Sequence, residues 1–471
     1  MSTLVTLPED VLSHVFSGLE QNDNRSLACA CRRLRTLRGR GWRVLDFHNH
    51  TVARLVTRLQ SLIELLKSDK VLALAVREVS IRYVNMMAFA GRRFKPVPAS
   101  EKAPFKKFDP LLSTVLRLTR SLETFVLDGP PGIGFDQMYP KSIDAICTLP
   151  QLRVLIIGRV HGAKEDGSHP YTPKLASTHL TSVIVAFPIQ LDQDALVRGQ
   201  RHLQCLGLEL DGTESGNLGN DWTDLRELRM DNLWVSAEVE LCWDLWVDIT
   251  RNALAAGALR KLDFLYIRGP ATYAQLDTLV TMLSREHVPL TKLYFIAQDE
   301  NMKIWPEFGP ATLLKIFRAF PLLESLCIDN DDVDINRKPH ARATSWPRDW
   351  DDYLPAFLHA QSLKTFIMPA GSVPSLHRLA RAGLASGLFF REALMDMFSP
   401  MLNACPTLTF VGLGDCNDLG QINLFRTGHE MEVASPEHLS RRFFWLSDET
   451  RDVAREGRYM TCCGVWGKVQ R

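Results

Sequence analysis

Apolar residues recur along most of this chain in a fixed six-residue pattern. Each copy has apolar side chains at its first, fourth and sixth positions, and more variable residues between them. Because strand side chains alternate between two faces, the fourth and sixth positions predict a short strand with one buried face. The copies lie at 76–81, 122–127, 152–157, 180–185, 203–208, 225–230, 262–267, 290–295, 323–328, 363–368 and 408–413. We interpret 42–47 as a degenerate first strand.

Several segments between the predicted strands have helical periodicity instead. The clearest covers 52–66, and similar apolar stripes cover 241–254, 276–283 and 311–317. A repeated strand and helix predicts a parallel sheet with helices on its outer side, and no single unit can bury its apolar face alone. We therefore expect an α/β fold whose units stack into a curved solenoid. The alternative is a doubly wound α/β fold, but the fixed pattern of every copy favours the solenoid.

The spacing of the copies is irregular, which places extra length between some strands. Neighbouring copies begin 22 residues apart at 203 and 225, but 46 apart at 76 and 122. Regular leucine-rich repeats have a period of about 20–29 residues. We expect the excess to form a basic loop at 92–108, a polar loop at 158–174 and an acidic loop at 329–353. Long insertions of this kind are often functional.

Residues 6–34 have a different pattern, typical of two short amphipathic helices. Thr6 and Glu9 are spaced as in a capping box at a helix start, and Pro8 is tolerated in a first turn. A polar turn leads to a second helix that begins near Leu27. Two such helices cannot bury all their apolar surface against each other, so part of it is left for a partner. The alternative is an ordinary helical hairpin that packs on its own domain.

This segment resembles an F-box, the helical module that docks a protein onto the Skp adaptor of cullin-type ubiquitin ligases. The six-residue repeat is similar to the divergent leucine-rich repeats of fungal F-box proteins. The resemblance implies an F-box at 1–48, a leucine-rich-repeat-like solenoid at 49–430 and a capping tail at 431–471. It implies adaptor contacts by Leu7, Pro8, Val11, Leu12, Val15, Phe16, Leu19, Leu27, Cys31, Arg32 and Leu34.

Composition and charge indicate the cellular compartment and the classes of partner. The chain has 471 residues, of which 46% are hydrophobic and 23% are charged, as is typical of a soluble globular protein. A net charge of +1 creates no strong electrostatic attraction to nucleic acid or membranes. No apolar run is long enough to span a bilayer. Ten cysteines are scattered among apolar positions, which indicates a reducing compartment. We expect a cytoplasmic or nuclear protein that binds neither nucleic acid nor membrane.

The sequence has no evident catalytic motif. The glycine-rich segment 128–134 lacks the Gly-Lys-Ser/Thr ending of a phosphate loop, and no cysteine pair has zinc-ligand spacing. We therefore expect no cofactor, no metal and no enzymatic activity. The leading hypothesis is a substrate receptor that holds a target near the ubiquitin-charged enzyme, so that proximity drives the transfer. The alternatives are an adaptor-bound scaffold without ligase function, and a ligase that uses Cys462 or Cys463 as its own nucleophile.

The predicted register also indicates a target-binding surface. In leucine-rich repeats, the residues between the apolar strand positions face the concave side of the sheet. In the middle repeats these include Arg229, Asp231, Tyr266, Arg268 and Tyr294. Aromatic residues and arginines are enriched at binding hot spots, so we expect a target protein to bind here, with the loop at 329–353 as a lid. The alternative is that these residues only solvate the concave face.

Overall fold

A computed structural model covers the whole chain and describes the elements that build the sheet and its helices. The chain divides into two compact units, and the boundary between them lies between Leu203 and Gln204. The described residues are 12, 23, 26, 42–48, 52–82, 99–128, 140–161, 172–189, 191–209, 221–231, 239–269, 273–297, 309–330, 350–369, 398–416, 420–427 and 430–433.

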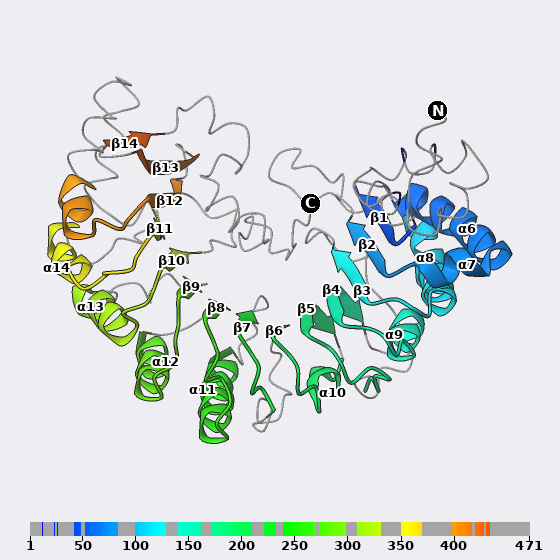
Figure 1. Ribbon diagram of the computed structural model, residues 1–471, viewed down its shortest axis with the longest axis horizontal. Coiled ribbons are helices and arrows are strands. Elements are labelled where there is room, and N and C mark those ends of the chain that lie inside the picture. Colours follow the sequence, from blue (N-terminus) through cyan, green and yellow to red (C-terminus); the bar gives the residue numbers. More distant parts are fainter. Residues whose placement is uncertain are drawn as a thin grey trace. The chain divides into compact units, whose positions relative to one another are not determined.

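The first unit contains a parallel sheet whose strand order follows the chain order. Its strands are β1 (Val44–His48), β2 (Glu78–Arg82), β3 (Thr124–Asp128), β4 (Val154–His161) and β5 (Ser182–Ile189). Its helices are α6 (Val52–Ser68), α7 (Lys70–Ala75), α8 (Ala99–Leu118), α9 (Pro140–Cys147) and α10 (Gln193–Val197). These helices line the outer side of the sheet (Figure 1).

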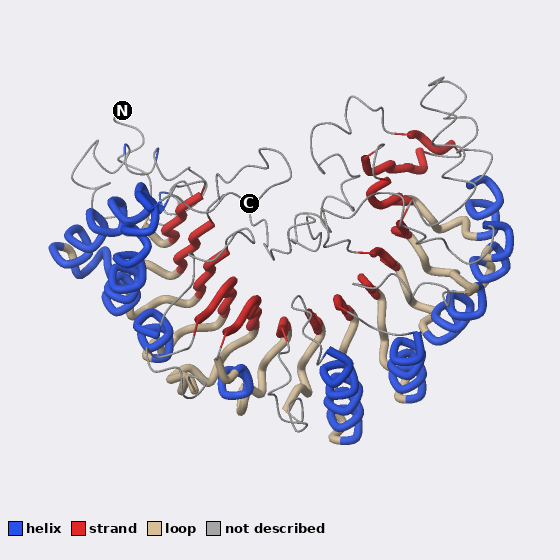
Figure 2. Tube along the Cα trace, turned by 180° about the vertical axis from the view of Figure 1, so that it is seen from behind, coloured by secondary structure: helices blue, strands red, loops and turns tan. Residues whose placement is uncertain are grey.

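The second unit repeats the same arrangement and ends in an antiparallel hairpin. Its parallel strands are β6 (Cys205–Glu209), β7 (Glu227–Asp231), β8 (Phe264–Gly269), β9 (Lys292–Ala297), β10 (Ser325–Asn330), β11 (Thr365–Pro369) and β12 (Phe410–Cys416). Strands β13 (Gly420–Thr427) and β14 (Glu430–Val433) follow with antiparallel pairing. The helices α11 (Val239–Ala255), α12 (Tyr273–Arg285), α13 (Pro310–Ala319) and α14 (Leu354–Phe357) lie outside the sheet, with a 3₁₀ turn at Trp350–Asp352 (Figure 2).

The fourth and sixth positions of each six-residue copy fill the core between sheet and helices. Phe125 and Leu127 on β3 are buried, as are Leu326 and Ile328 on β10. The first position, such as Leu122, is buried just before the strand begins. Burying an aliphatic side chain of this size stabilises a fold by about 1.5–3 kcal/mol relative to leaving it exposed. The apolar pattern therefore specifies which face of each strand packs against the helices.

The second position of each copy links neighbouring repeats through its backbone carbonyl. The carbonyl of Lys364 accepts the N–H groups of Thr409 and Phe410 at 2.9 and 3.0 Å. The carbonyl of Glu324 accepts those of Lys364 and Thr365 at 2.8 and 2.9 Å. The same paired bonds recur between the other described repeats of each unit. They satisfy the carbonyl groups where the strands begin and fix the register of each strand on the next.

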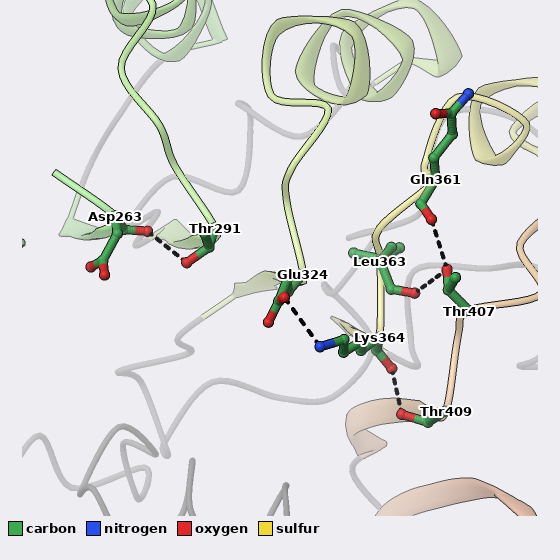
Figure 3. Close-up of polar contacts among 8 residues, drawn as sticks. All are labelled: Asp263, Thr291, Glu324, Gln361, Leu363, Lys364, Thr407 and Thr409. Carbon is green, nitrogen blue, oxygen red and sulfur yellow. Dashed lines mark hydrogen bonds and ion pairs between the residues drawn. The ribbon is translucent and has the colours of Figure 1, made fainter. Parts of the chain in front are cut away.

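Side chains reinforce this column of carbonyls, as Figure 3 shows for the second unit. The ammonium group of Lys364 lies 3.1 Å from the carboxylate of Glu324 on the preceding repeat. The hydroxyl of Thr291 donates to the carbonyl of Asp263 at 3.2 Å, and that of Thr409 donates to the carbonyl of Lys364 at 3.0 Å. The polar second position is therefore a structural feature of the repeat, which holds each unit on its neighbour.

Two helices of the second unit end in a left-handed residue. Gly257 follows α11 with φ 77°, and His287 follows α12 with φ 53°. The N–H of Gly257 donates to Leu254, and that of His287 donates to Ser284, so each turns the chain out of its helix. Glycine adopts this conformation without strain, whereas an L-residue such as histidine does not.

The described strands confirm all eleven copies of the sequence pattern and the degenerate first strand, which becomes β1. The doubly wound alternative is wrong, because the parallel strands of each unit follow the chain order and the helices lie on one side of each sheet (Figures 1 and 2). Each unit therefore has a solenoid-like α/β architecture. The four helices predicted from periodicity appear as α6, α11, α12 and α13.

The structure corrects the expected loop at 92–108 and differs from the simple repeat near 420. Residues 99–108 belong to α8 despite Pro104. Phe108, Leu112 and Leu116 are buried and spaced by four residues, so packing of this stripe outweighs the cost of proline. The antiparallel strands β13 and β14 were not predicted, because a hairpin needs no six-residue copy of its own.

Candidate functional site

The predicted adaptor contacts lie almost entirely outside the described residues. Leu12 is the exception, since it is helical and 0% exposed. Contact between Leu12 and the adaptor stays a prediction, as do the contacts of the other ten residues. Asp23 and Ser26 are also helical, but neither was expected to bind the adaptor.

The predicted target-binding residues lie in one row across neighbouring strands of the second unit. Arg229 on β7 pairs in register with Tyr266 on β8, which pairs with Tyr294 on β9. Asp231 and Arg268 form the next register pair along β7 and β8. Because core residues alternate with these positions, the row lies on the face of the sheet opposite the helices. The backbone of Asp231 and Arg268 is described, whereas their side chains fall outside the description.

Arg229 and Tyr294 of this row belong to a network of side chains that crosses four strands. Arg229 donates from Nε to Oε1 of Glu227, two residues earlier on β7, and the two form a buried ion pair. The guanidinium carbon of Arg229 lies 5.6 Å from the ring centroid of Phe264 on β8. Phe264 meets the Tyr294 ring edge to face, with centroids 5.1 Å apart. The hydroxyls of Tyr294 and Ser325 are 3.1 Å apart, which extends the network to β10.

No protein-family model matches this chain. A search of curated proteins finds no match either. The F-box and the leucine-rich repeats are therefore predictions from the sequence alone.

The described side chains of the predicted target-binding row are buried, whereas we expected them to form an exposed surface. Arg229, Tyr266 and Tyr294 are only 3%, 1% and 3% exposed. On the inner face of a curved sheet, large side chains on strands about 4.8 Å apart shield one another from water. The aromatic rings and the ion pair therefore pack against one another in this structure and are shielded from water. Target binding at these residues stays a prediction, and a solvent-exposed row of these three side chains is not what the structure contains.

The sequence interpretation missed Glu227, Phe264 and Ser325, which complete the network. All three occupy the third position of the six-residue copy, two residues before the fifth position, which Arg229, Tyr266 and Tyr294 occupy in their own copies. The alternation that selected Arg229 and Tyr266 also applies to them. What the sequence did not indicate is that a carboxylate and an arginine on one strand would be buried together.

The described residues offer no evident metal centre or reactive thiol. They include no group of three or more histidine, cysteine, aspartate or glutamate side chains that could hold a metal ion. Cys147 is buried at the end of α9, and desolvation raises the pKa of its thiol to about 11. A hydrogen bond with the Lys174 backbone lowers this pKa, but the nearby charge of Asp144 raises it further. A thiol of such low acidity is a poor nucleophile.

The cysteines that the sequence raised as a possible nucleophile, Cys462 and Cys463, lie outside the described residues. Of the helices in the described part, none has the length and apolar character needed to cross a membrane.

Proposed function

We propose that this protein is a substrate-recognition subunit of an SCF-type cullin ubiquitin ligase. The supporting observation is the order of its parts: a segment with F-box spacing at 6–34 precedes a solenoid-like α/β fold built from repeats. Solenoid folds commonly serve as extended binding surfaces. In this role the chain carries out no chemistry. It docks on the Skp adaptor and holds a target lysine near the ubiquitin thioester, which raises the effective concentration of that lysine.

Adaptor binding is the decisive experiment. Phe16→Ala combined with Val15→Ala removes two apolar side chains, each worth about 1.5–3 kcal/mol if fully buried at the interface. The double variant should bind purified Skp adaptor about 100-fold more weakly or worse. A truncated chain that begins at Trp42, and so retains β1, should not bind the adaptor while keeping its strand and helix content. Calorimetry with the isolated adaptor measures both.

A matched control uses apolar side chains outside the F-box segment. Val71 and Leu74 on α7 are 75% and 54% exposed, so their replacement by alanine should leave the fold intact. Adaptor binding by this control should equal that of the wild type. If the chain beginning at Trp42 still binds the adaptor, or if the α7 variant loses binding equally, the F-box proposal is wrong.

The two alternative functions predict different outcomes in the same preparations. A scaffold without ligase function would recover the adaptor but no cullin from cell extracts. A ligase with its own nucleophile would discharge ubiquitin from a charged conjugating enzyme without any cullin, and the double variant Cys462→Ser and Cys463→Ser would stop this. The substrate-receptor proposal predicts cullin in the complex and no discharge by the chain alone.

The target surface can be tested at the register pair Asp231 and Arg268. Asp231→Lys together with Arg268→Glu exchanges the two charges and leaves the buried ion pair of Glu227 and Arg229 in place. If targets bind the concave face, proteins co-purified with the variant should lose a specific partner while the adaptor is retained. An unchanged set of partners would direct the search to another surface.

A further inference from the structure

The outer side of the second unit has a groove between α12 and α13. Its volume is about 500 Å³, and both helices contribute apolar and cationic side chains to its walls. Val280 of α12 and Ala311 and Leu314 of α13 provide an apolar surface. Arg285, Lys315 and Arg318 contribute three cations. None of these residues belongs to the concave network or to the segment expected to bind an adaptor.

The groove runs along the two helices rather than across them. Its residues recur at helical spacing on α13 from Ala311 to Ala319, a distance of about 12 Å at 1.5 Å per residue. The two helices run in the same direction, because each leads through a short turn into one of the parallel strands β9 and β10. Arg285 and Arg318 lie in the last turns of their helices, so both cations lie toward the same end of the groove.

The cations differ in whether they are already neutralised. Lys315 forms an ion pair with Asp277 of α12 across the helix pair. Arg285 and Arg318 are exposed, and within the described part of the chain neither makes an ion pair or a side-chain hydrogen bond. One end of the groove therefore has two available guanidinium groups, while the apolar surface lies further along it. Guanidinium groups bind carboxylates through paired hydrogen bonds.

A role at the helix ends is the competing explanation for these arginines. Cations near a helix C-terminus interact favourably with the helix dipole, and both residues are placed accordingly. This accounts for each arginine separately. It does not account for the apolar groove between them or for their position on the same groove. Peptide binding separates the two explanations, because a role confined to the helix ends involves no ligand.

We propose that the groove between α12 and α13 binds an acidic peptide segment of a partner protein. Apolar side chains of the segment contact Val280 and Leu314, and its aspartate or glutamate side chains pair with Arg285 and Arg318. The proposal rests on two observations. The positive charges of Arg285 and Arg318 are complementary to acidic side chains, and an apolar groove about 12 Å long lies between the two helices. It goes beyond the proposed function, because it requires neither adaptor docking nor ubiquitin transfer.

The test uses the full chain and a defined probe. The probe is a short fluorescein-labelled peptide with two leucines one helical turn apart, followed by a run of glutamates. Fluorescence anisotropy should show saturable binding by the wild-type chain. Arg285→Glu combined with Arg318→Glu should weaken binding by about tenfold or more. Because both side chains are exposed, the variant should keep the wild-type circular dichroism spectrum.

A matched control reverses the same amount of charge elsewhere in the unit. Arg226 and Arg260 are exposed, and neither lines the groove. Arg226→Glu with Arg260→Glu should therefore leave binding of the glutamate peptide within about twofold of the wild type. A peptide with lysines in place of the glutamates should not bind. Equal losses in the two double variants, or equal binding of the two peptides, would mean that no specific site exists and would overturn the proposal.

A second measurement does not depend on any substitution. The probe is made with a photoreactive benzophenone in place of one leucine and is cross-linked to the wild-type chain. Mass spectrometry should find the cross-link on α12 or α13, whose bounds are Tyr273–Arg285 and Pro310–Ala319. Cross-links confined to other segments, or the absence of saturable binding in the first assay, would also overturn the proposal.

Discussion

Removal of the buried arginine in the concave network should destabilise the second unit far more than removal of an exposed cation from the same sheet. Arg229 is 3% exposed and pairs with Glu227, whose side chain is 11% exposed. Arg229→Met keeps much of the side-chain volume but removes the charge. Breaking a buried ion pair by removing one partner costs about 3–5 kcal/mol, because the other charge is held in a poorly solvated site. The loss of the contact with the Phe264 ring adds to this.

The comparison variant is Lys364→Met, which breaks the pair of Lys364 with Glu324. Those side chains are 49% and 42% exposed, and an exposed pair contributes about 0–1 kcal/mol. Urea denaturation followed by tryptophan fluorescence gives both free energies, and Trp222 and Trp246 are buried in the same unit. Hydrogen exchange of peptides from β7 and β8 locates the effect.

A double variant, Glu227→Gln with Arg229→Met, completes the cycle. It removes both charges and should recover part of the stability lost in Arg229→Met, because no buried carboxylate then loses its cation. The reasoning is refuted if Arg229→Met costs no more than Lys364→Met. It is also refuted if the double variant is less stable than the sum of its single substitutions predicts.

Three further predictions concern packing, helix ends and pH. Phe357→Ala should cost about 3–5 kcal/mol by denaturation, because this ring is 0% exposed, whereas Leu358→Ala next to it, at 64% exposed, should cost little. Gly257→Ala should lower stability and His287→Gly should raise it, each by about 1 kcal/mol in the same assay, because both positions have positive φ. At pH 8 the native Cys147 thiol should resist iodoacetamide, as peptide mass spectrometry would show, and react when unfolded. Burial raises the pKa of this thiol from 9.0 to about 11, so the unfolded chain loses the thiol proton at lower pH than the native protein. The contribution of Cys147 to the free energy of unfolding should therefore fall as the pH rises from 9.0 to about 11.

The repeating strands could be predicted because the same apolar pattern meets the same physical requirement in every repeat. A side chain such as Leu326 can be placed in the core from its own six-residue copy, without knowledge of its neighbours. The helix at 52–68 can also be predicted from its own local sequence, since its apolar stripe repeats over four turns. The order of the strands also follows, because stacked repeats pair each strand with the next one along the chain.

The helix over 99–118 and the terminal hairpin could not be predicted in this way. Pro104 argues against a helix locally, and only the packing of Phe108 and Leu112 in the core decides in favour of one. The strand at 420–427 depends on pairing with the edge of β12, and the strand at 430–433 depends on pairing with β13 in turn. Neither outcome is contained in a short window of sequence.

The amino-acid sequence by itself determined which residues of each strand face the helices and which lie on the concave side, because strand alternation is a local property. It placed Arg229, Tyr266 and Tyr294 in one row for this reason. Only the tertiary structure decided that the row is buried and that Glu227 and Phe264 join it, because burial depends on side chains brought together from different strands. The groove between α12 and α13 has the same origin, since its walls come from two helices that are adjacent only in the folded chain.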